Sequence, residues 1–178
     1  MITLKERGKR PKKLYWPRIF IDRSTSSNDL HTFLSKAGWP LERHCEYFDA
    51  DTDDDIWIQE IAAVRQWVIL TSDRALERTE IDSIISSKAK VIILTDNHSG
   101  WVRWAAALVA AQESINATLH EYDGPLVMRV AKTGNVSKVR QGDDLIEFQQ
   151  RLRTRRILRA KRAGTFNPKT YLTGEAIA

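Results

Sequence analysis

The chain has 178 residues, 42% of them hydrophobic and 29% charged, which is the composition of an ordinary globular protein with one domain and a real core. Its 28 Lys and Arg exceed its 23 Asp and Glu, so the net charge is +5. The acids are concentrated in the middle of the chain and the bases at its two ends. This asymmetry fits a polyanionic partner such as nucleic acid, or a merely solvated charged face.

Three classes of feature are excluded by the same numbers. The single cysteine, Cys45, rules out an intramolecular disulfide and suits a reducing compartment. The longest apolar stretch, residues 101–111, is too short to span a bilayer and is interrupted by Arg103. The basic N-terminus is not followed by the apolar segment of a secretory signal. We therefore expect a cytoplasmic protein that does not enter a membrane.

The chain begins with residues 1–17, which carry several bases and no hydrophobic period and are predicted to form a flexible basic arm. The apolar run at residues 18–22 is typical of a strand buried on both faces and ends in Asp22. Leu30, Phe33, Leu34 and Ala37 then recur at helical spacing, and Gly38 ends the helix. These elements open an α/β pattern.

The middle of the chain continues this alternation. Residues 43–48 are predicted to form a short second strand with Cys45 buried in it. Asp53 or Asp54 would cap the next helix, and a strand at residues 67–71 then leads to Asp73. Further elements are expected at residues 81–85 (helix, capped by Thr79), 91–94 (strand), 100–119 (helix), 125–130 and 136–140 (edge hairpin) and from residue 143 (helix).

This order predicts an α/β fold with three layers, α/β/α, and a mainly parallel central sheet. We expect the folded domain to span residues 18–142, and residues 143–178 to form a basic C-terminal helix and tail. Ligands of such sheets bind outside the carboxyl ends of the strands. Aspartates follow three of the predicted strands, namely Asp22, Asp73 and Asp96, and Asp54 begins a helix at the same edge.

Carboxylates gathered without cysteine or histidine partners indicate Mg²⁺ or Mn²⁺, because hard cations prefer oxygen ligands. Such ions assist the hydrolysis of phosphodiester bonds. A nucleic-acid substrate would explain both the acids in the middle of the chain and the bases at its ends. The plainer interpretation is that residues 51–55 form a solvated turn and helix cap.

Other chemistries have less support. The chain contains no GxGxxG and no GxxxxGK[ST] motif, and its four histidines show no zinc-ligand spacing. A phosphoaspartate enzyme would carry a second acid soon after Asp22. A receiver-type signalling module, for which Thr95 and Lys132 would be available, also has paired acids after its first strand, whereas Asp22 stands alone.

The sequence resembles the PIN-like nuclease domains related to VapC-type toxins. The resemblance rests on IFIDR, a helix ending in Ala37-Gly38, DDDIW and WVILTSD in this order, and extends from about Arg18 to Arg140. It implies that Asp22, Asp54 and Asp73 bind metal and act in catalysis. Asp96 is the best fourth acid, with Glu80 or Asn97 behind it. The resemblance further implies a Mg²⁺-dependent endoribonuclease, often the toxin of a toxin–antitoxin pair and often a homodimer.

Basic side chains would contact the RNA. Arg23, directly after Asp22, either binds phosphate or pairs with a neighbouring acid. The run of residues 151–162, with Arg153, Arg155 and Arg156, would hold RNA, dock an acidic antitoxin or form an exposed helix. The alternative to a nuclease is a catalytically silent relative that binds nucleic acid or a partner protein through its basic ends.

Overall fold

Six strands form a single sheet in the computed structural model, which describes residues 16–95 and 100–168. The strands are β1 (Ile19–Ile21), β2 (Leu41–Arg43), β3 (Val68–Thr71), β4 (Lys90–Leu94), β5 (Leu126–Val130) and β6 (Val136–Gln141). Their order is β2-β1-β3-β4-β5-β6, and all neighbours are parallel except β5 and β6, which form the predicted antiparallel hairpin. The order reverses between β1 and β3, which makes the carboxyl ends of these two strands the topological switch point.

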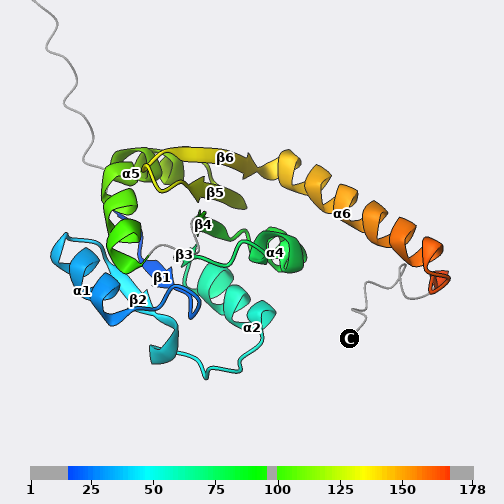
Figure 1. Cartoon of the computed structure of the whole chain (residues 1–178), viewed down its shortest axis with the longest axis horizontal. Helices are drawn as coiled ribbons and strands as arrows, with labels where there is room; N and C mark the ends of the chain where they lie inside the picture. The colour runs from blue at the N-terminus through cyan, green and yellow to red at the C-terminus, as the bar shows by residue number, and fades with distance from the viewer. Residues whose placement is uncertain (1–15, 96–99, 169–178) are drawn as a thin grey trace, which may run out of the picture.

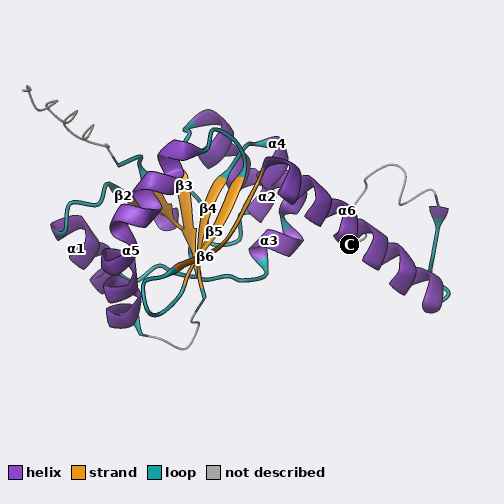
Figure 2. Cartoon of the chain, turned by 90° about the horizontal axis from the view of Figure 1, so that it is seen from above, coloured by secondary structure: helices purple, strands orange, loops and turns teal. Residues whose placement is uncertain are grey.

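Helices cover both faces of this sheet (Figures 1 and 2). They are α1 (Asn28–Lys36), α2 (Asp54–Gln59), α3 (Leu76–Thr79), α4 (Ile81–Ser86), α5 (Trp101–Glu121) and α6 (Gly142–Arg162), with a 3₁₀ turn η1 (His44–Glu46) and a π-helical turn η2 (Glu60–Val64). Helices α1 and α5 lie on one face, and α2, η2 and α4 on the other. The predicted three-layer fold is confirmed.

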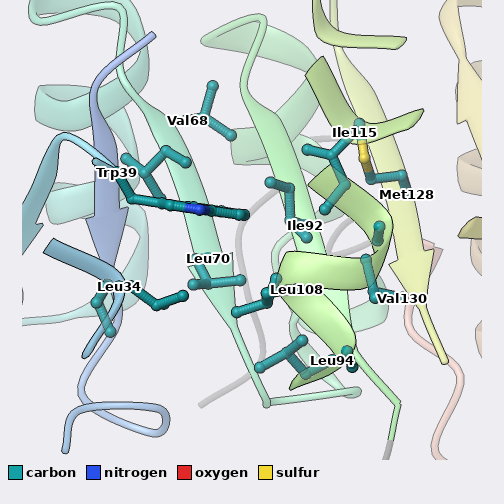
Figure 3. Packing of buried hydrophobic residues seen from close by; sticks show 14 of the residues in the cluster. Leu34, Trp39, Val68, Leu70, Ile92, Leu94, Leu108, Ile115, Met128 and Val130 are labelled. Atoms are coloured by element: carbon teal, nitrogen blue, oxygen red, sulfur yellow. The ribbon is translucent and has the colours of Figure 1, made fainter. Parts of the chain in front are cut away.

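Alternation of side chains along the strands divides the core into two parts. Ile19, Leu70 and Ile92 face α1 and α5, in the packing that Figure 3 shows around Trp39 and Leu108. Phe20, Ile69 and Ile93 face the other way, toward α2 and α4. Because the central strands are buried on both faces, they read as continuous apolar runs in the sequence.

Two local predictions need correction. The second strand ends at Arg43, and His44–Glu46 form η1 rather than a longer strand, so Cys45 is exposed and not buried. The helix expected at residues 81–85 does start at Ile81, but Glu80 and not Thr79 is its N-cap, and it is preceded by the unpredicted short helix α3. Most of the predicted basic arm lies outside the described residues, but Trp16, at its end, stacks on Trp39 with 4.4 Å between ring centroids.

Candidate active site at the switch point

Asp22 begins the candidate site at the carboxyl end of β1. Its backbone N–H donates to the carbonyl of Leu70 over 3.0 Å, which continues the pairing of β1 with β3. The side chain is only 4% exposed, and its Oδ2 accepts hydrogen bonds from Ser24 Oγ (2.6 Å) and Thr71 Oγ1 (2.8 Å). A buried carboxylate needs such donors, and these two hold it in one orientation. Within the described part of the chain, no hydrogen bond ends on its Oδ1.

Asp73 is joined to Asp22 through Thr71. The backbone N–H of Asp73 donates to Thr71 Oγ1 over 2.9 Å, and Asp73 Oδ1 accepts the N–H of Ala75 over 2.7 Å. This second bond closes a local turn that fixes the Asp73 side chain at the start of the segment leading into α3. The Thr71 hydroxyl therefore links the Asp22 carboxylate to the backbone of Asp73, and the two residues lie at the ends of neighbouring parallel strands, as their positions in the sequence predict.

Asp54 lies in a different set of contacts. Its Oδ1 accepts from Arg23 Nη2 (2.6 Å) and from the indole Nε1 of the buried Trp57 (2.9 Å). Arg23 also donates from Nη1 to the carbonyls of Ala50 (2.6 Å) and Thr52 (3.0 Å). Of the two sequence-based interpretations of Arg23, pairing with a neighbouring acid is the one seen, and it fixes the loop before α2 at the end of β1.

Glu80, one of the rivals for the fourth acid, is close enough to sense the charge of Asp54. Burial raises the pKa of Glu80 above its usual value, and the negative charge of Asp54 acts in the same direction. Arg156, on α6, acts in the opposite direction. Asp96, the preferred fourth acid, lies outside the described residues, as does Asn97.

His44 was not predicted as part of this region. It is 2% exposed, packed among the rings of Phe20, Phe48 and Trp57, and its Nε2 has no hydrogen-bond partner among the described residues. Burial is the main cause that lowers the pKa of His44, and the charges of Asp22 and Asp54 oppose it. A lone histidine in a segment predicted to be a strand gave no indication that it would lie near Asp22 and Asp54. The hydroxyls of Ser24 and Thr71 were also missed, although each stands within two residues of a predicted acid.

The described acids do not form a closed metal cage. Among the residues that the structure describes, no group of three or more Asp, Glu, His or Cys side chains is close enough to hold a metal ion. Asp22, Asp73 and Asp54 nevertheless share one feature, since the hydrogen bonds described for each carboxylate all end on a single oxygen. Carboxylates that bind metals are commonly held by hydrogen bonds in this way.

The predicted RNA-binding arginines of α6 differ in their contacts. Arg153 pairs with Asp82 of α4 at 2.9 Å, and Arg156 donates from Nη2 to the carbonyl of Arg78 at 3.0 Å. Arg155 is exposed and makes no ion pair with the described acids. Arg153 and Arg156 thus attach α6 to α3 and α4.

A hollow of about 450 Å³ lies at the opposite edge of the sheet, where the strands begin, and is lined by Pro17, Lys88 and Lys90 among others. It contains none of the predicted acids. Along the described chain, no helix has the length and apolar character needed to cross a membrane.

Comparison with known proteins agrees with the fold. Residues 17–96 match the family model described as a PIN like domain. This segment, from the start of β1 to the residues after β4, therefore forms a PIN-like domain, which is a nuclease-type fold. The predicted resemblance to PIN-like domains is confirmed there, while β5, β6 and α6 lie beyond the match. No curated protein and no solved structure matches the chain.

Proposed function

We propose that this protein is a metal-dependent endoribonuclease that hydrolyses phosphodiester bonds of RNA in the cytoplasm. The observation that carries the proposal is the junction of Asp22 and Asp73 through Thr71 at the carboxyl ends of β1 and β3. Ligands of open α/β sheets bind at this point of the fold. The PIN-like match over residues 17–96 supports a nuclease reaction.

The donor set fits Mg²⁺ or Mn²⁺. Mg²⁺ is commonly bound through one or two carboxylates, with water and substrate phosphate as its other ligands. Asp22 and Asp73 would hold the ion through the oxygens that the described chain leaves without hydrogen bonds, and Asp54 and Asp96 are the further ligands that the sequence suggests. When bound, the ion would activate a water and neutralise charge on the phosphodiester.

The chain's own residues orient the reacting groups. Ser24 and Thr71 hold the Asp22 carboxylate, and the Ala75 N–H holds that of Asp73, so neither has to reorganise when substrate arrives. Arg23, 39% exposed at its side chain, holds its guanidinium against Asp54, where it would contact a phosphate oxygen. Asp54 thereby has a positioning role as well as its proposed role as a ligand.

We further propose that the protein is the toxin of a toxin–antitoxin pair and forms a homodimer. These proposals rest on the sequence resemblance to VapC-related domains. The partner would be an antitoxin protein, and its gene would lie beside that of this chain.

One observation favours a second candidate, a catalytically silent relative that binds RNA. The Arg23–Asp54 ion pair already places a cation against one of the three proposed ligands. If Arg23 holds Asp54 permanently, two carboxylates remain in the described part of the site.

Substitution of the two linked acids tests the first proposal. Asp22→Asn and Asp73→Asn should each reduce cleavage of a panel of RNAs with Mg²⁺ or Mn²⁺ by at least about 100-fold, because loss of even an outer partner of a metal ligand costs about 10- to 100-fold. Asp123→Asn, at the opposite edge of the sheet, is the matched control and should retain activity. Unchanged activity in both site variants would exclude the proposal. Calorimetry without metal binding at millimolar concentration, together with salt-sensitive RNA binding, would favour the silent relative.

A further inference from the structure

Helix α6 carries a line of arginines that the proposed active site does not use. Residues 151–162 contain seven bases and no acid. Among them Arg151, Arg155, Arg159 and Arg162 follow one another at spacings of four, four and three residues, so they lie along one side of the helix. We call these four residues the arginine stripe. All four are exposed.

The stripe differs from the arginines that attach the helix. Arg153 and Arg156 point to Asp82 and to the carbonyl of Arg78, as described above. In the stripe, Arg151 makes a loose contact of 3.6 Å with Glu147, and Arg155, Arg159 and Arg162 have no acid within ion-pair distance among the described residues. The attachment of α6 therefore leaves the stripe facing solvent.

The contacts of α6 with the body of the protein are made by its first part. Leu145 is buried, Phe148 and Leu152 pack on the core between the sheet and α4, and Arg156 makes the hydrogen bond nearest the C-terminus to another described element. Beyond it the helix extends away from the sheet (Figures 1 and 2). In this last part, the contacts described are with the residues that directly follow α6, such as Phe166 beneath Lys161.

The charge of α6 is not explained by its own helix dipole. Bases stabilise a helix within its last turn, which here holds Arg159, Lys161 and Arg162. The stripe begins two turns earlier, at Arg151. A helical end that is highly charged and makes few tertiary contacts is only marginally stable by itself. Stability of the helix therefore does not explain why this segment carries so many bases.

The helix is attached to the two helices that follow Asp73, one of the proposed catalytic acids. Arg78 and Asp82, its two polar anchors, lie in α3 and α4, in the segment that directly follows Asp73. The charge of Arg156 acts on Glu80, which also senses Asp54. A polyanion lying along α6 would thus reach the acids at its anchored end.

We propose that the arginine stripe binds the phosphate backbone of single-stranded RNA and leads it to the carboxyl ends of β1 and β3. This inference rests on the proposed ribonuclease function. The four guanidinium groups rise by about 6 Å per four-residue step along the helix, so they can contact successive phosphates of one strand. Arginine suits this task because its planar fork matches phosphate.

The stripe fits RNA better than an acidic protein. A protein interface has an apolar core within a polar rim, whereas Leu158, 49% exposed, is the only exposed large apolar side chain in the described part of the chain from Arg151 onward. A regular line of positive charge with so little apolar surface is the complement of a phosphate backbone.

Binding of a fluorescein-labelled single-stranded RNA of about 20 nucleotides, measured by anisotropy in EDTA across a salt series, tests the stripe without hydrolysis. The double variant Arg155→Gln/Arg159→Gln removes two of its charges. The double variant Lys36→Gln/Lys88→Gln removes the same charge from exposed sites on α1 and after α4 and is the control. Circular dichroism should show that both variants are folded.

Each phosphate contact on a single strand contributes about 0.7 to the slope of log K against log salt. The stripe variant should therefore lose about 1.4 from the magnitude of that slope and bind about 25-fold more weakly at 0.1 M salt, whereas the control should stay within about twofold of the wild type. Arg155→Lys/Arg159→Lys should recover the slope.

Equal losses in the two double variants, or no loss in either, would overturn the proposal. Tighter binding to a polyglutamate peptide than to RNA through the same arginines would also overturn it, since the stripe would then be a protein-docking surface. RNA cleavage is assayed separately. Stripe-dependent binding without cleavage would refute the ribonuclease function and leave the stripe standing. RNA cleavage by the stripe variant with an unchanged KM would refute the role of the stripe and leave the ribonuclease function standing.

Discussion

Thr71 Oγ1 donates to Asp22 Oδ2 over 2.8 Å, and the same oxygen accepts the backbone N–H of Asp73. Thr71 is fully buried, so its hydroxyl acts as an internal bridge between the ends of β1 and β3. This one side chain therefore contributes to the position of both proposed catalytic acids.

Replacing Thr71 by Val should therefore disturb both acids. Val preserves the shape but leaves a buried carboxylate oxygen and a backbone N–H each without one hydrogen bond, which should cost about 1–3 kcal/mol of stability. Any RNA cleavage should fall by about 10- to 100-fold, the usual effect of losing an outer partner of a metal ligand. Thr71→Ser keeps the hydroxyl and should retain most of both properties. Urea unfolding and the cleavage assay measure the two effects, and a Val variant equal to the wild type in both would refute the bridging role.

Glu77 of α3 should be among the most sensitive positions outside the site. Its fully buried carboxylate pairs with Arg129 of β5 and Arg140 of β6, which ties the antiparallel hairpin to the segment after Asp73. Glu77→Ala leaves two half-buried guanidinium groups without this partner and should cost about 3–5 kcal/mol. Glu147→Ala removes an exposed partner of Arg151 and should change stability by less than about 1 kcal/mol. Chemical unfolding of the two variants provides the comparison, and similar losses would contradict the buried network.

The free energy of unfolding should decrease as the pH falls, because His44 becomes protonated. Burial lowers the pKa of His44 below its ordinary value of 6.5, so below pH 6.5 the unfolded chain binds more protons at this residue than the folded chain. The contribution of His44 to the stability of the folded protein is complete above pH 6.5 and is lost progressively as the pH falls toward the pKa of His44 in the folded state. His44→Phe places an apolar ring in the same aromatic cage and should flatten the pH dependence of stability in that range. Thermal melts between pH 5 and pH 8 follow the change, with identical profiles as the contrary outcome.

Two glycines with positive φ should differ in their tolerance of alanine. Gly38 has φ +86° and open space where a Cβ would lie, so Gly38→Ala should cost only the left-handed backbone strain, about 1–2 kcal/mol. At Gly134, φ +82°, a Cβ would lie 2.5 Å from that of Ala110 on α5. Gly134→Ala should add about 1–3 kcal/mol of overpacking to the same strain. Unfolding midpoints test the order, and equal costs would mean that the hairpin moves freely away from α5.

The local pattern of apolar and polar residues was sufficient to predict most of the helices and strands. The runs ending in Asp22, Thr71 and Leu94 read as buried strands because each is apolar on both faces, and the structure places them side by side in the sheet. Prediction from the local pattern failed at residues 44–48, where polar and apolar residues alternate as in a strand. There the chain turns into η1 because His44 packs into the aromatic cage on Phe20 and Trp57, a contact between distant segments.

The sequence by itself determined that aspartates follow neighbouring strands and that bases gather at the C-terminal end. These features are read from periodicity and from single positions along the chain. Only the tertiary structure decided how the groups are paired: Asp22 with Asp73 through Thr71, Asp54 with Arg23, and Arg153 with Asp82. Such pairings join residues up to 71 positions apart, and hydrogen bonds and ion pairs depend on angstrom distances that strand order and helix docking set.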